Sequence, residues 1–441
     1  MIQCYISTSE NKYLVPTPFI KESGNITIHI DKKQRFQEID GFGASFTDSS
    51  AYLVNQILNK QQKKEVMEAL FGREQGIGLS LLRNPMGASD YARSIYSYDD
   101  MPEGEEDLAL EHFHVQHDQE DIIPLTRWAQ QLNPALKVIA SPWSAPGWMK
   151  DSGKVVTGQL LKRYYEVYAT YFYRFIDAYQ SEGIDIYAVT PQNEPLFVPE
   201  NYPGMLLPAE EAVDFVKNYL RPTFETHGLH TKILGYDHNW DRVDYPLELL
   251  DKAYEAFDGV AWHWYGGKVI SQSRVTHAFP DKEVHFTEGS GGEWIPAFEP
   301  AFSNLIRTGI DILRNYAKSF ILWNIALDEN NGPTVPGFGE STCRGLLEIN
   351  QTKKEYEFTL DYFGLAHFSK WVEVGATRIA SDETKEIKTV AFENSDASIV
   401  VILFNQTEKA QLVTMKIDQN EFTIDLPSKA ASTCIFSKDD K

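Results

Sequence analysis

Two glutamates stand where an acid–base pair could operate. Glu194 follows a short apolar run in the segment Gln192-Asn193-Glu194-Pro195, and Glu288 closes another run, Glu283–Glu288. A carboxylate among apolar and aromatic neighbours is unfavourable unless it is paired, and functional sites are where proteins tolerate that cost. Two carboxylates facing each other about 5–5.5 Å apart can hydrolyse a glycoside with retention. One attacks the anomeric carbon and the other protonates the departing oxygen.

Further polar and aromatic residues lie near the ends of neighbouring apolar runs. The chain contains 9 Trp, 22 Tyr and 25 Phe among 441 residues, and aromatic rings suit sugars because the C–H faces of a pyranose stack on them. The residues that stand at or near the ends of these runs include Arg83, Asp90, Trp143, Asn193, His263, Tyr265 and Trp323.

The apolar pattern predicts the elements that must position these residues. Eight short runs rich in β-branched and aromatic residues alternate with amphipathic segments, such as the predicted helices Leu160–Tyr179 and Pro208–Tyr219. This alternation is typical of a (β/α)₈ TIM barrel, whose chemistry lies at the C-terminal ends of the strands. A doubly wound sheet is the alternative, but no glycine fingerprint opens a helical segment. The predicted strands are Gln37–Phe46, Leu79–Pro85, Leu136–Pro142, Ile184–Pro191, Thr231–Tyr236, Gly259–Tyr265, Glu283–Glu288 and Ser319–Leu327.

Beyond about Phe368 the pattern changes to strands without helices between them. The predicted strands are Thr389–Phe392, Ser398–Asn405, Gln411–Ile417, Phe422–Leu426 and Thr433–Phe436, and Ile26–Ile30 alternates in the same way before the barrel. Such a series predicts a small antiparallel β-sandwich built from both chain ends. We expect the catalytic barrel to span residues 36–367 and the side domain to comprise residues 1–35 and 368–441.

Seven segments in order resemble those of a known enzyme family. They are GFGASFTD (Gly41–Asp48), LLRNPMGASDY (Leu81–Tyr91), ASPWSAPGWMK (Ala140–Lys150), AVTPQNEP (Ala188–Pro195), WHWY (Trp262–Tyr265), FTEGSGG (Phe286–Gly292) and ILWNIALD (Ile321–Asp328). The segment HFSKWVEVGATRI (His367–Ile379) extends the match. Together they resemble glycoside hydrolase family 30, the family of lysosomal glucosylceramidase and its bacterial relatives.

The resemblance implies catalytic roles for the two glutamates. Glu194 would be the general acid/base and Glu288 the nucleophile. We expect the negative Glu288 and a low-dielectric setting to raise the pKa of Glu194, so that it starts protonated. One departure is visible, since lysosomal glucosylceramidase has Cys two residues after its nucleophile and this chain has Ser290.

The resemblance also implies binding roles. Asn193 would hydrogen-bond the sugar 2-OH, and Arg83 would keep Glu288 ionised. Asp90 would bind hydroxyls on the far side of the glucose ring. Trp143 and Trp323 would line that pocket, and His263 and Tyr265 would hold or orient the carboxylates.

These implications favour a retaining exo-β-glycosidase of the glucosylceramidase or β-glucosidase type, acting on a small glycoside or oligosaccharide. A β-1,6-glucanase or β-xylosidase of the same family is the alternative, because the barrel loops that separate them cannot be interpreted from one sequence. A carbohydrate-binding protein without activity is disfavoured, since both carboxylates are present.

Composition narrows the partners. The net charge of −22 repels nucleic acids and anionic membranes. The sequence contains no run of about 18 apolar residues, so we expect no membrane-spanning helix. The start, Met1–Tyr5, shows no signal peptide, so we expect a cytoplasmic protein, or a secreted one if a leader was removed. The oligomeric state is left open.

No metal or cofactor is expected. The three cysteines, Cys4, Cys343 and Cys434, form no metal-ligand spacing, and the histidines of Glu111–Asp118 do not match a zinc pattern. We expect that segment and the acidic run Asp99–Asp107 to be solvated, and Asp48 to cap the helix after it.

Overall fold

The computed structural model describes residues 2–8, 12–293 and 301–437, and its centre is a closed eight-stranded barrel. All neighbouring strands are parallel and follow the order β10-β11-β4-β5-β6-β7-β8-β9. Each strand falls within, or overlaps, one of the eight predicted runs, so the predicted barrel is confirmed. The strands are β4 (Gly41–Ser45), β5 (Leu81–Met86), β6 (Lys137–Pro142), β7 (Ile186–Val189), β8 (Lys232–Asn239), β9 (Gly259–His263), β10 (Glu283–Glu288) and β11 (Ser319–Asn324).

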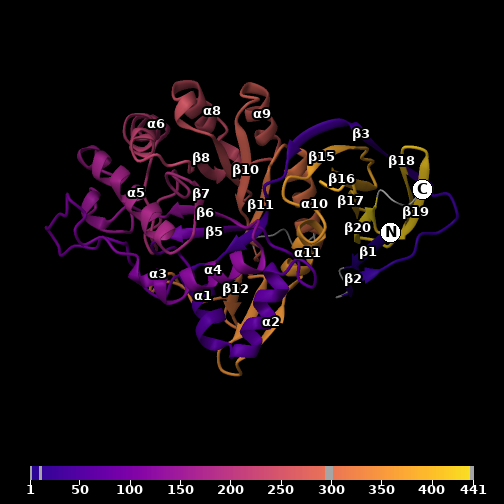
Figure 1. The fold of residues 1–441 in the computed structure, drawn as a ribbon, viewed down its shortest axis with the longest axis horizontal. Helices are drawn as coiled ribbons and strands as arrows, with labels where there is room; N and C mark the ends of the chain where they lie inside the picture. Colours follow the sequence, from indigo (N-terminus) through magenta and orange to yellow (C-terminus); the bar gives the residue numbers. More distant parts are fainter. Residues whose placement is uncertain (1, 9–11, 294–300, 438–441) are drawn as a thin grey trace.

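Helices surround the barrel strands (Figure 1). The predicted helix Leu160–Tyr179 is α5 (Tyr165–Ser181), which begins later because a 3₁₀ turn, Lys162–Tyr164, precedes it. The predicted helix Pro208–Tyr219 is α6 (Ala209–Phe215) and a π-helical turn, Val216–Leu220. The others are α1 (Asp48–Tyr52), α2 (Lys60–Phe71), α3 (Gln116–Glu120), α4 (Ile122–Leu132), α7 (Arg221–Thr226), α8 (Asp244–Lys252), α9 (Ile270–Ala278), α10 (Ala301–Arg314) and α11 (Leu360–Ser369).

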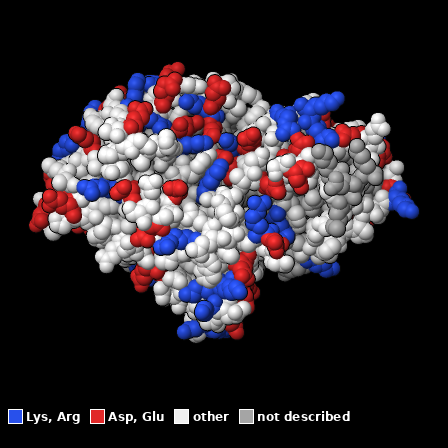
Figure 2. Space-filling view, in the orientation of Figure 1, with Lys and Arg blue, Asp and Glu red and all other residues white. Residues whose placement is uncertain are grey.

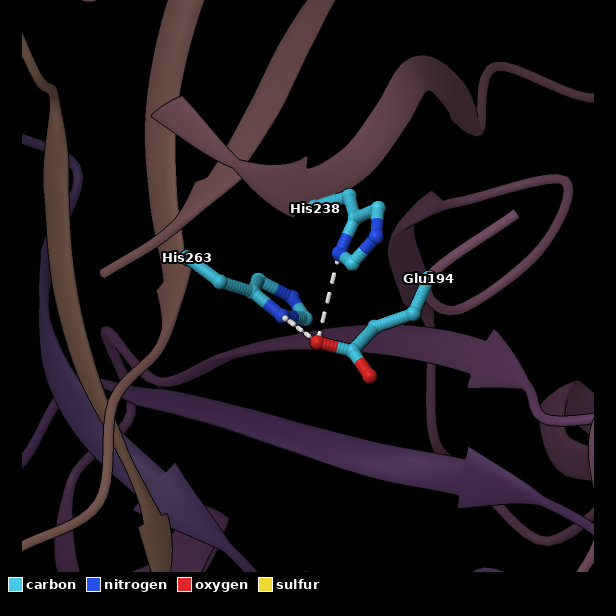
Figure 3. A group of neighbouring side chains, drawn as sticks. All are labelled: Glu194, His238 and His263. Atoms are coloured by element: carbon cyan, nitrogen blue, oxygen red, sulfur yellow. Dashed lines mark hydrogen bonds and ion pairs between the residues drawn. The ribbon is translucent and has the colours of Figure 1, made fainter. Parts of the chain in front are cut away.

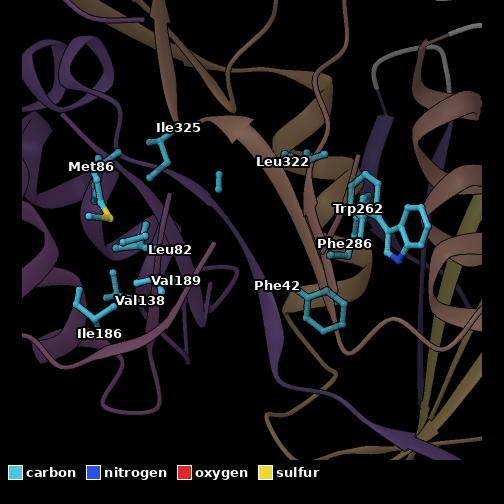
Figure 4. Close-up of a cluster of buried hydrophobic side chains, with 14 of the residues drawn as sticks. Phe42, Leu82, Met86, Val138, Ile186, Val189, Trp262, Phe286, Leu322 and Ile325 are labelled. Carbon is cyan, nitrogen blue, oxygen red and sulfur yellow. The ribbon is translucent and has the colours of Figure 1, made fainter. Parts of the chain in front are cut away.

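Strand alternation divides the apolar residues between two cores. Leu81 belongs to a small cluster inside the barrel, whereas the next residue, Leu82, joins the large cluster between strands and helices (Figure 4). The inner cluster takes one residue each from β5, β6, β7, β8, β9 and β11. Because successive side chains of a strand point to opposite faces, buried strands need apolar residues at both parities. This explains their continuous apolar runs.

A nine-stranded sheet beside the barrel is built from both chain ends, with order β19-β18-β3-β15-β16-β17-β20-β1-β2. Residues of strands from both halves of that order, such as Met415 and Phe436, share one buried cluster, so the sheet folds over on itself as a sandwich. The pairings are antiparallel, as predicted for the sandwich, except for β3 with β18, which is parallel. The strands are β1 (Ile2–Thr8), β2 (Lys12–Pro16), β3 (Ile26–Glu38), β15 (Thr377–Ser381), β16 (Ile387–Glu393), β17 (Ile399–Asn405), β18 (Gln411–Ile417), β19 (Asn420–Leu426) and β20 (Ala431–Phe436).

The last predicted barrel strand, Ser319–Leu327, is divided. Its first part is β11, and its end is β12 (Ala326–Asp328), which pairs with β13 (Leu347–Asn350) and through it with β14 (Glu355–Phe358). This three-stranded sheet has no counterpart among the predicted elements. The chain therefore leaves the barrel at Ile325.

Of two expectations about acidic residues, one is wrong and the other holds only in part. Thr47, not Asp48, caps α1, and Asp48 is buried in an ion pair with Arg93 at 2.9 Å. The run Asp99–Asp107 is solvated between its ends, since residues 102–106 are exposed, but its two end residues are buried. Each of the two carboxylates accepts a hydrogen bond. Trp148 Nε1 donates to Asp99 Oδ2, and the backbone N–H of His112 donates to Asp107 Oδ2.

The surface carries acidic and basic side chains side by side on the face shown in Figure 2. Among the described residues, no helix is both long enough and apolar enough to cross a membrane.

Candidate active site

A cavity of about 480 Å³ contains residues that follow or end the barrel strands. Glu194 follows β7, and Glu288 is the last residue of β10. Seven of the nine predicted site residues line the cavity: Asp90, Trp143, Asn193, Glu194, Tyr265, Glu288 and Trp323. The other two, Arg83 and His263, are fully buried and bond to the carboxylates of that set.

Glu194 is held at its backbone and at one carboxylate oxygen. Its φ of 47° lies in the left-handed region, and its N–H donates to the carbonyl of Asp237 at 3.0 Å. A non-glycine residue in this region is costly, and such conformations cluster at functional sites. Oε1 lies 3.2 Å from His263 Nδ1 and 3.3 Å from His238 Nδ1, so both rings point at one oxygen (Figure 3).

Glu288 is held by different partners. Arg83 Nη1 donates to its Oε2 at 2.8 Å, and the Tyr265 hydroxyl donates to its Oε1 at 2.9 Å. His263 Nδ1 lies 3.9 Å from Oε1. Because the same Nδ1 is 3.2 Å from Glu194 Oε1, the sum of the two distances, about 7 Å, limits the separation of these two oxygens. A separation within that limit is compatible with the distance of about 5–5.5 Å between the carboxyl groups of a retaining enzyme. It is shorter than most of the range of about 6.5–9.5 Å found in inverting enzymes.

Asp237 ties these groups together from β8. Its carboxylate accepts from Arg83 Nη2 at 2.7 Å and from Thr287 Oγ1 at 2.6 Å, and it lies 3.0 Å from His263 Nε2. The side chain is fully buried. A local irregularity in the β8–β9 pairing, with Tyr236 and Asp237 at positive φ, accompanies this placement.

Sequence reasoning missed Asp237, His238 and Asn239, although the last two line the cavity. The predicted fifth strand ends at Tyr236, and none of the predicted site residues follows it. The signal was available, since Asp-His-Asn follows that run directly. Phe197, Tyr202 and Cys343 were also missed because they lie on loops beyond the strands.

The pKa values differ from the expectation for Glu194. Burial would raise its pKa, but the two neighbouring histidines, His238 and His263, outweigh burial and hold the pKa below its usual range. Burial raises the pKa of Glu288, against the opposing charges of His263 and Arg83. Burial would lower the pKa of His263, but its interactions with Glu288, Asp237 and Glu194 outweigh burial and raise the pKa to about 9. In the cavity without sugar, the mobile proton therefore rests on His263.

Besides the glutamates, the cavity presents an acid, Asp90, and two indoles. Burial, with the nearby charges of Glu288 and Glu194, raises the pKa of Asp90 to about 8, and its Oδ1 is buried without a hydrogen-bond partner. A protonated carboxyl can both donate to and accept from a hydroxyl group. Trp143 and Trp323 stack on each other with ring centroids 4.9 Å apart, and Arg83 lies 5.1 Å from the Trp143 ring.

Comparison with known proteins matches most of the chain. The family model for the glycosyl hydrolase family 30 TIM-barrel domain matches residues 39–372, and the family 30 β-sandwich model matches residues 375–434. An endo-1,6-β-D-glucanase of Neurospora crassa is 31% identical over 95% of this chain and 91% of its own. The lysosomal acid glucosylceramidase of Mus musculus is 26% identical over 87% and 78%. The solved structure of the endo-β1,6-glucanase BT3312 has a TM-score of 0.92 and 33% identity, covering 99% of both chains.

Proposed function

This chain belongs to glycosyl hydrolase family 30, and from that membership we propose that it is a retaining endo-β-1,6-glucanase. The observation that carries the proposal is the pair Glu194 and Glu288, each held by its own partners within one cavity. The similarity to endo-1,6-β-glucanases at 31% and 33% identity over nearly the whole chain supports the linkage. This reverses the order of the two functions favoured by the sequence alone.

The first step is attack by Glu288 on the anomeric carbon. Arg83 and Tyr265 each occupy one oxygen of Glu288 and orient the carboxylate. The bond from the anomeric carbon to the glycosidic oxygen breaks as the bond to Glu288 forms, and Glu194 protonates the departing oxygen. Because Arg83 also donates to Asn193 Oδ1 at 2.7 Å, the amide nitrogen of Asn193 is the group left to hydrogen-bond the sugar 2-OH.

The proton for this step is shared between Glu194 and His263. His263 holds it in the open cavity, with Nδ1 3.2 Å from Glu194 Oε1. A bound sugar excludes water from Glu194, which disfavours its charged form and moves the proton to the carboxylate. After the covalent intermediate forms, Glu194 accepts a proton from water, and the hydroxide displaces Glu288 with retention of configuration.

Sugar recognition rests on the other residues that line the cavity. Asp90 would bind glucose hydroxyls through its unpartnered Oδ1, and Trp143 and Trp323 would contact the ring. Phe197 and Tyr265 are 48% and 38% exposed at the cavity, where further glucosyl units of a chain could stack on them.

An exo-acting β-glucosidase of the glucosylceramidase type is the second candidate. The similarity to mouse lysosomal acid glucosylceramidase supports it, and so does a cavity whose polar residues suit one glucose unit. Both candidates use the same two glutamates and differ in what lies beyond the bond that is cleaved.

Early product sizes distinguish the candidates. We would incubate the protein with the β-1,6-glucan pustulan, gentiobiose, glucosylceramide, and aryl β-glucoside and β-xyloside. An endo-β-1,6-glucanase releases gentio-oligosaccharides of mixed length from pustulan at low conversion. Release of glucose alone, with faster turnover of glucosylceramide, would favour the second candidate. Equal rates for wild type and Glu288→Gln on every substrate would contradict hydrolysis at this site.

A further inference from the structure

We propose that Glu194, His238 and His263 form a binding site for one transition-metal ion of the Zn²⁺ class. One candidate ligand atom of each residue lies within 4.8 Å of the others, and both histidines direct Nδ1 at Glu194 Oε1 (Figure 3). The distances from that oxygen are 3.2 Å to His263 and 3.3 Å to His238. No metal was expected from the sequence, where the search for metal-ligand spacing covered the cysteines and the histidines of Glu111–Asp118 but not these three residues, which lie far apart along the chain.

The spacing suits tetrahedral coordination. Zinc binds histidine nitrogen and carboxylate oxygen at about 2.0–2.2 Å, which places neighbouring ligands of a tetrahedral site about 3.3 Å apart. The two measured separations already have this value. Glu288 Oε1, 3.9 Å from His263 Nδ1, or a water molecule from the cavity can supply the fourth ligand.

His263 also has the outer partner that a metal-binding histidine needs. Its Nε2 lies 3.0 Å from Asp237 Oδ1, on the side of the ring away from Glu194. Metal-bound histidines usually donate their other N–H to a carboxylate, which orients the ring and increases its basicity as a ligand. The arrangement Asp237–His263 therefore orients Nδ1 for coordination, and the ion that binds there displaces the proton that His263 otherwise holds into the solvent.

His238 provides an independent sign that a ligand is missing. It is only 9% exposed, and its Nδ1 makes no hydrogen bond although Glu194 Oε1 lies 3.3 Å away. A buried ring nitrogen without a hydrogen bond is costly, and a metal ion would remove that cost. Among the described residues, a second such group consists of Asp40, Glu283 and His285. This group shows no sign of a missing cation, because three lysines already pair with its carboxylates.

Metal binding would block the proposed reaction. An ion on Glu194 Oε1 occupies the carboxylate that protonates the leaving group and detaches it from His263. We therefore expect Zn²⁺ to inhibit hydrolysis reversibly, with activity restored by a chelator. This consequence rests on the proposed function, whereas metal binding itself does not.

The test measures binding first. The full chain, freed of metal with EDTA and then dialysed, is titrated with Zn²⁺ in competition with a chromophoric chelator. Wild type should bind one equivalent, and His238→Asn should bind it at least about tenfold more weakly. His112→Asn is the matched control, since His112 is an exposed histidine paired with Asp107 outside the cavity. Equal affinity in wild type and His238→Asn, or no stoichiometric binding by wild type, would overturn the proposal.

A second measurement needs no variant. Co²⁺ in place of Zn²⁺ should give the intense visible absorption of a four-coordinate nitrogen–oxygen site, and Zn²⁺ should abolish it. A weak octahedral spectrum, typical of surface carboxylates, would contradict the site. If the metal binds but no glycoside is hydrolysed, the proposed function fails and the metal site stands; if hydrolysis proceeds without stoichiometric binding, the reverse holds.

Discussion

Asp237 and Arg83 form an ion pair sealed from solvent, with 2.7 Å between Oδ2 and Nη2 and neither side chain exposed. The same guanidinium donates to Glu288 and to Asn193. One buried cation from β5 thus orients groups that come from β8, from β10 and from the segment after β7. The carboxylate of Asp237 is what allows that cation to stay in the barrel interior, because a buried charge without a partner is strongly unfavourable.

Replacing Asp237 should therefore cost stability. We expect Asp237→Ala to lower the free energy of unfolding by about 3–5 kcal/mol, because it removes one partner of a buried pair and leaves Arg83 undercompensated. Urea denaturation followed by circular dichroism measures this. Asp244→Ala is the control, since Asp244 is 64% exposed in its ion pair with Arg242 and should cost less than about 1 kcal/mol. Similar losses in the two variants would contradict the importance of burial.

Glu194→Gln should have an effect that depends on the leaving group. General acid catalysis contributes about 10²–10⁴-fold, so hydrolysis of β-1,6-glucan should fall by that factor. A dinitrophenyl β-glucoside needs no protonation to depart, and its first step should be almost unchanged. Burst kinetics with both substrates measure the difference. A uniform loss on the two substrates would mean that Glu194 is not the acid.

Azide should identify the role of each carboxylate. In Glu288→Gly, azide can take the place of the missing nucleophile and attack the anomeric carbon from that face, giving an α-glucosyl azide. In Glu194→Ala, azide should attack the covalent intermediate and give the β-anomer. NMR of the products distinguishes the two. If the products were exchanged between the variants, the roles would be reversed.

The barrel was predictable because its strands are buried on both faces and separated by amphipathic segments. Runs such as Leu136–Pro142 satisfy both conditions, and the structure places β6 there. β1 and β2 were not predicted, because their stability comes from pairing with each other and with β20 at the far end of the chain. Such long-range pairing leaves little signal in the local pattern.

The site was predictable to the extent that its residues stand at strand ends. Glu194 and Glu288 were found in this way, but the partners that set their pKa values were not. The expected rise in the pKa of Glu194 considered Glu288 alone, whereas His238 and His263 contact its oxygen directly. Loop residues such as Tyr202 and Cys343 reach the cavity only through the tertiary fold.

Asp90 should act as a neutral acid. Its pKa of about 8, raised by burial and by Glu288 and Glu194, leaves it protonated at pH 7. We expect Asp90→Ala to lower kcat/KM about 10- to 100-fold through lost hydroxyl binding, and Asp90→Asn to lose much less because an amide also donates and accepts.

The pH profile checks this assignment. In wild type, kcat/KM should fall above about pH 8, where Asp90 becomes a third negative charge beside the two glutamates. In Asp90→Asn, that decline should move towards pH 9, near the pKa of His263. An alkaline decline at the same pH in both proteins would exclude Asp90 as its source.

His367 should make the junction between barrel and sandwich sensitive to acid. It lies on α11, fully buried, with Nδ1 2.8 Å from Thr433 Oγ1 on β20 and Nε2 2.7 Å from Ser7 Oγ on β1. Burial lowers its pKa to about 3 from 6.5. Between these values the unfolded chain binds more protons than the folded chain, so stability falls as pH drops below 6.5. The loss from this group should reach about 2 kcal/mol at pH 5.

His367→Gln separates this contribution from other acid effects, because an amide keeps one hydrogen bond and does not titrate. The variant should lose stability at pH 7.5, where the neutral imidazole serves both strands, yet show a smaller decrease between pH 7.5 and 5 than wild type. Urea midpoints at the two pH values measure both quantities. Since His112 is exposed, His112→Asn supplies the comparison for removing a histidine that is not buried. An equal decrease in wild type and His367→Gln would place the acid sensitivity elsewhere in the molecule.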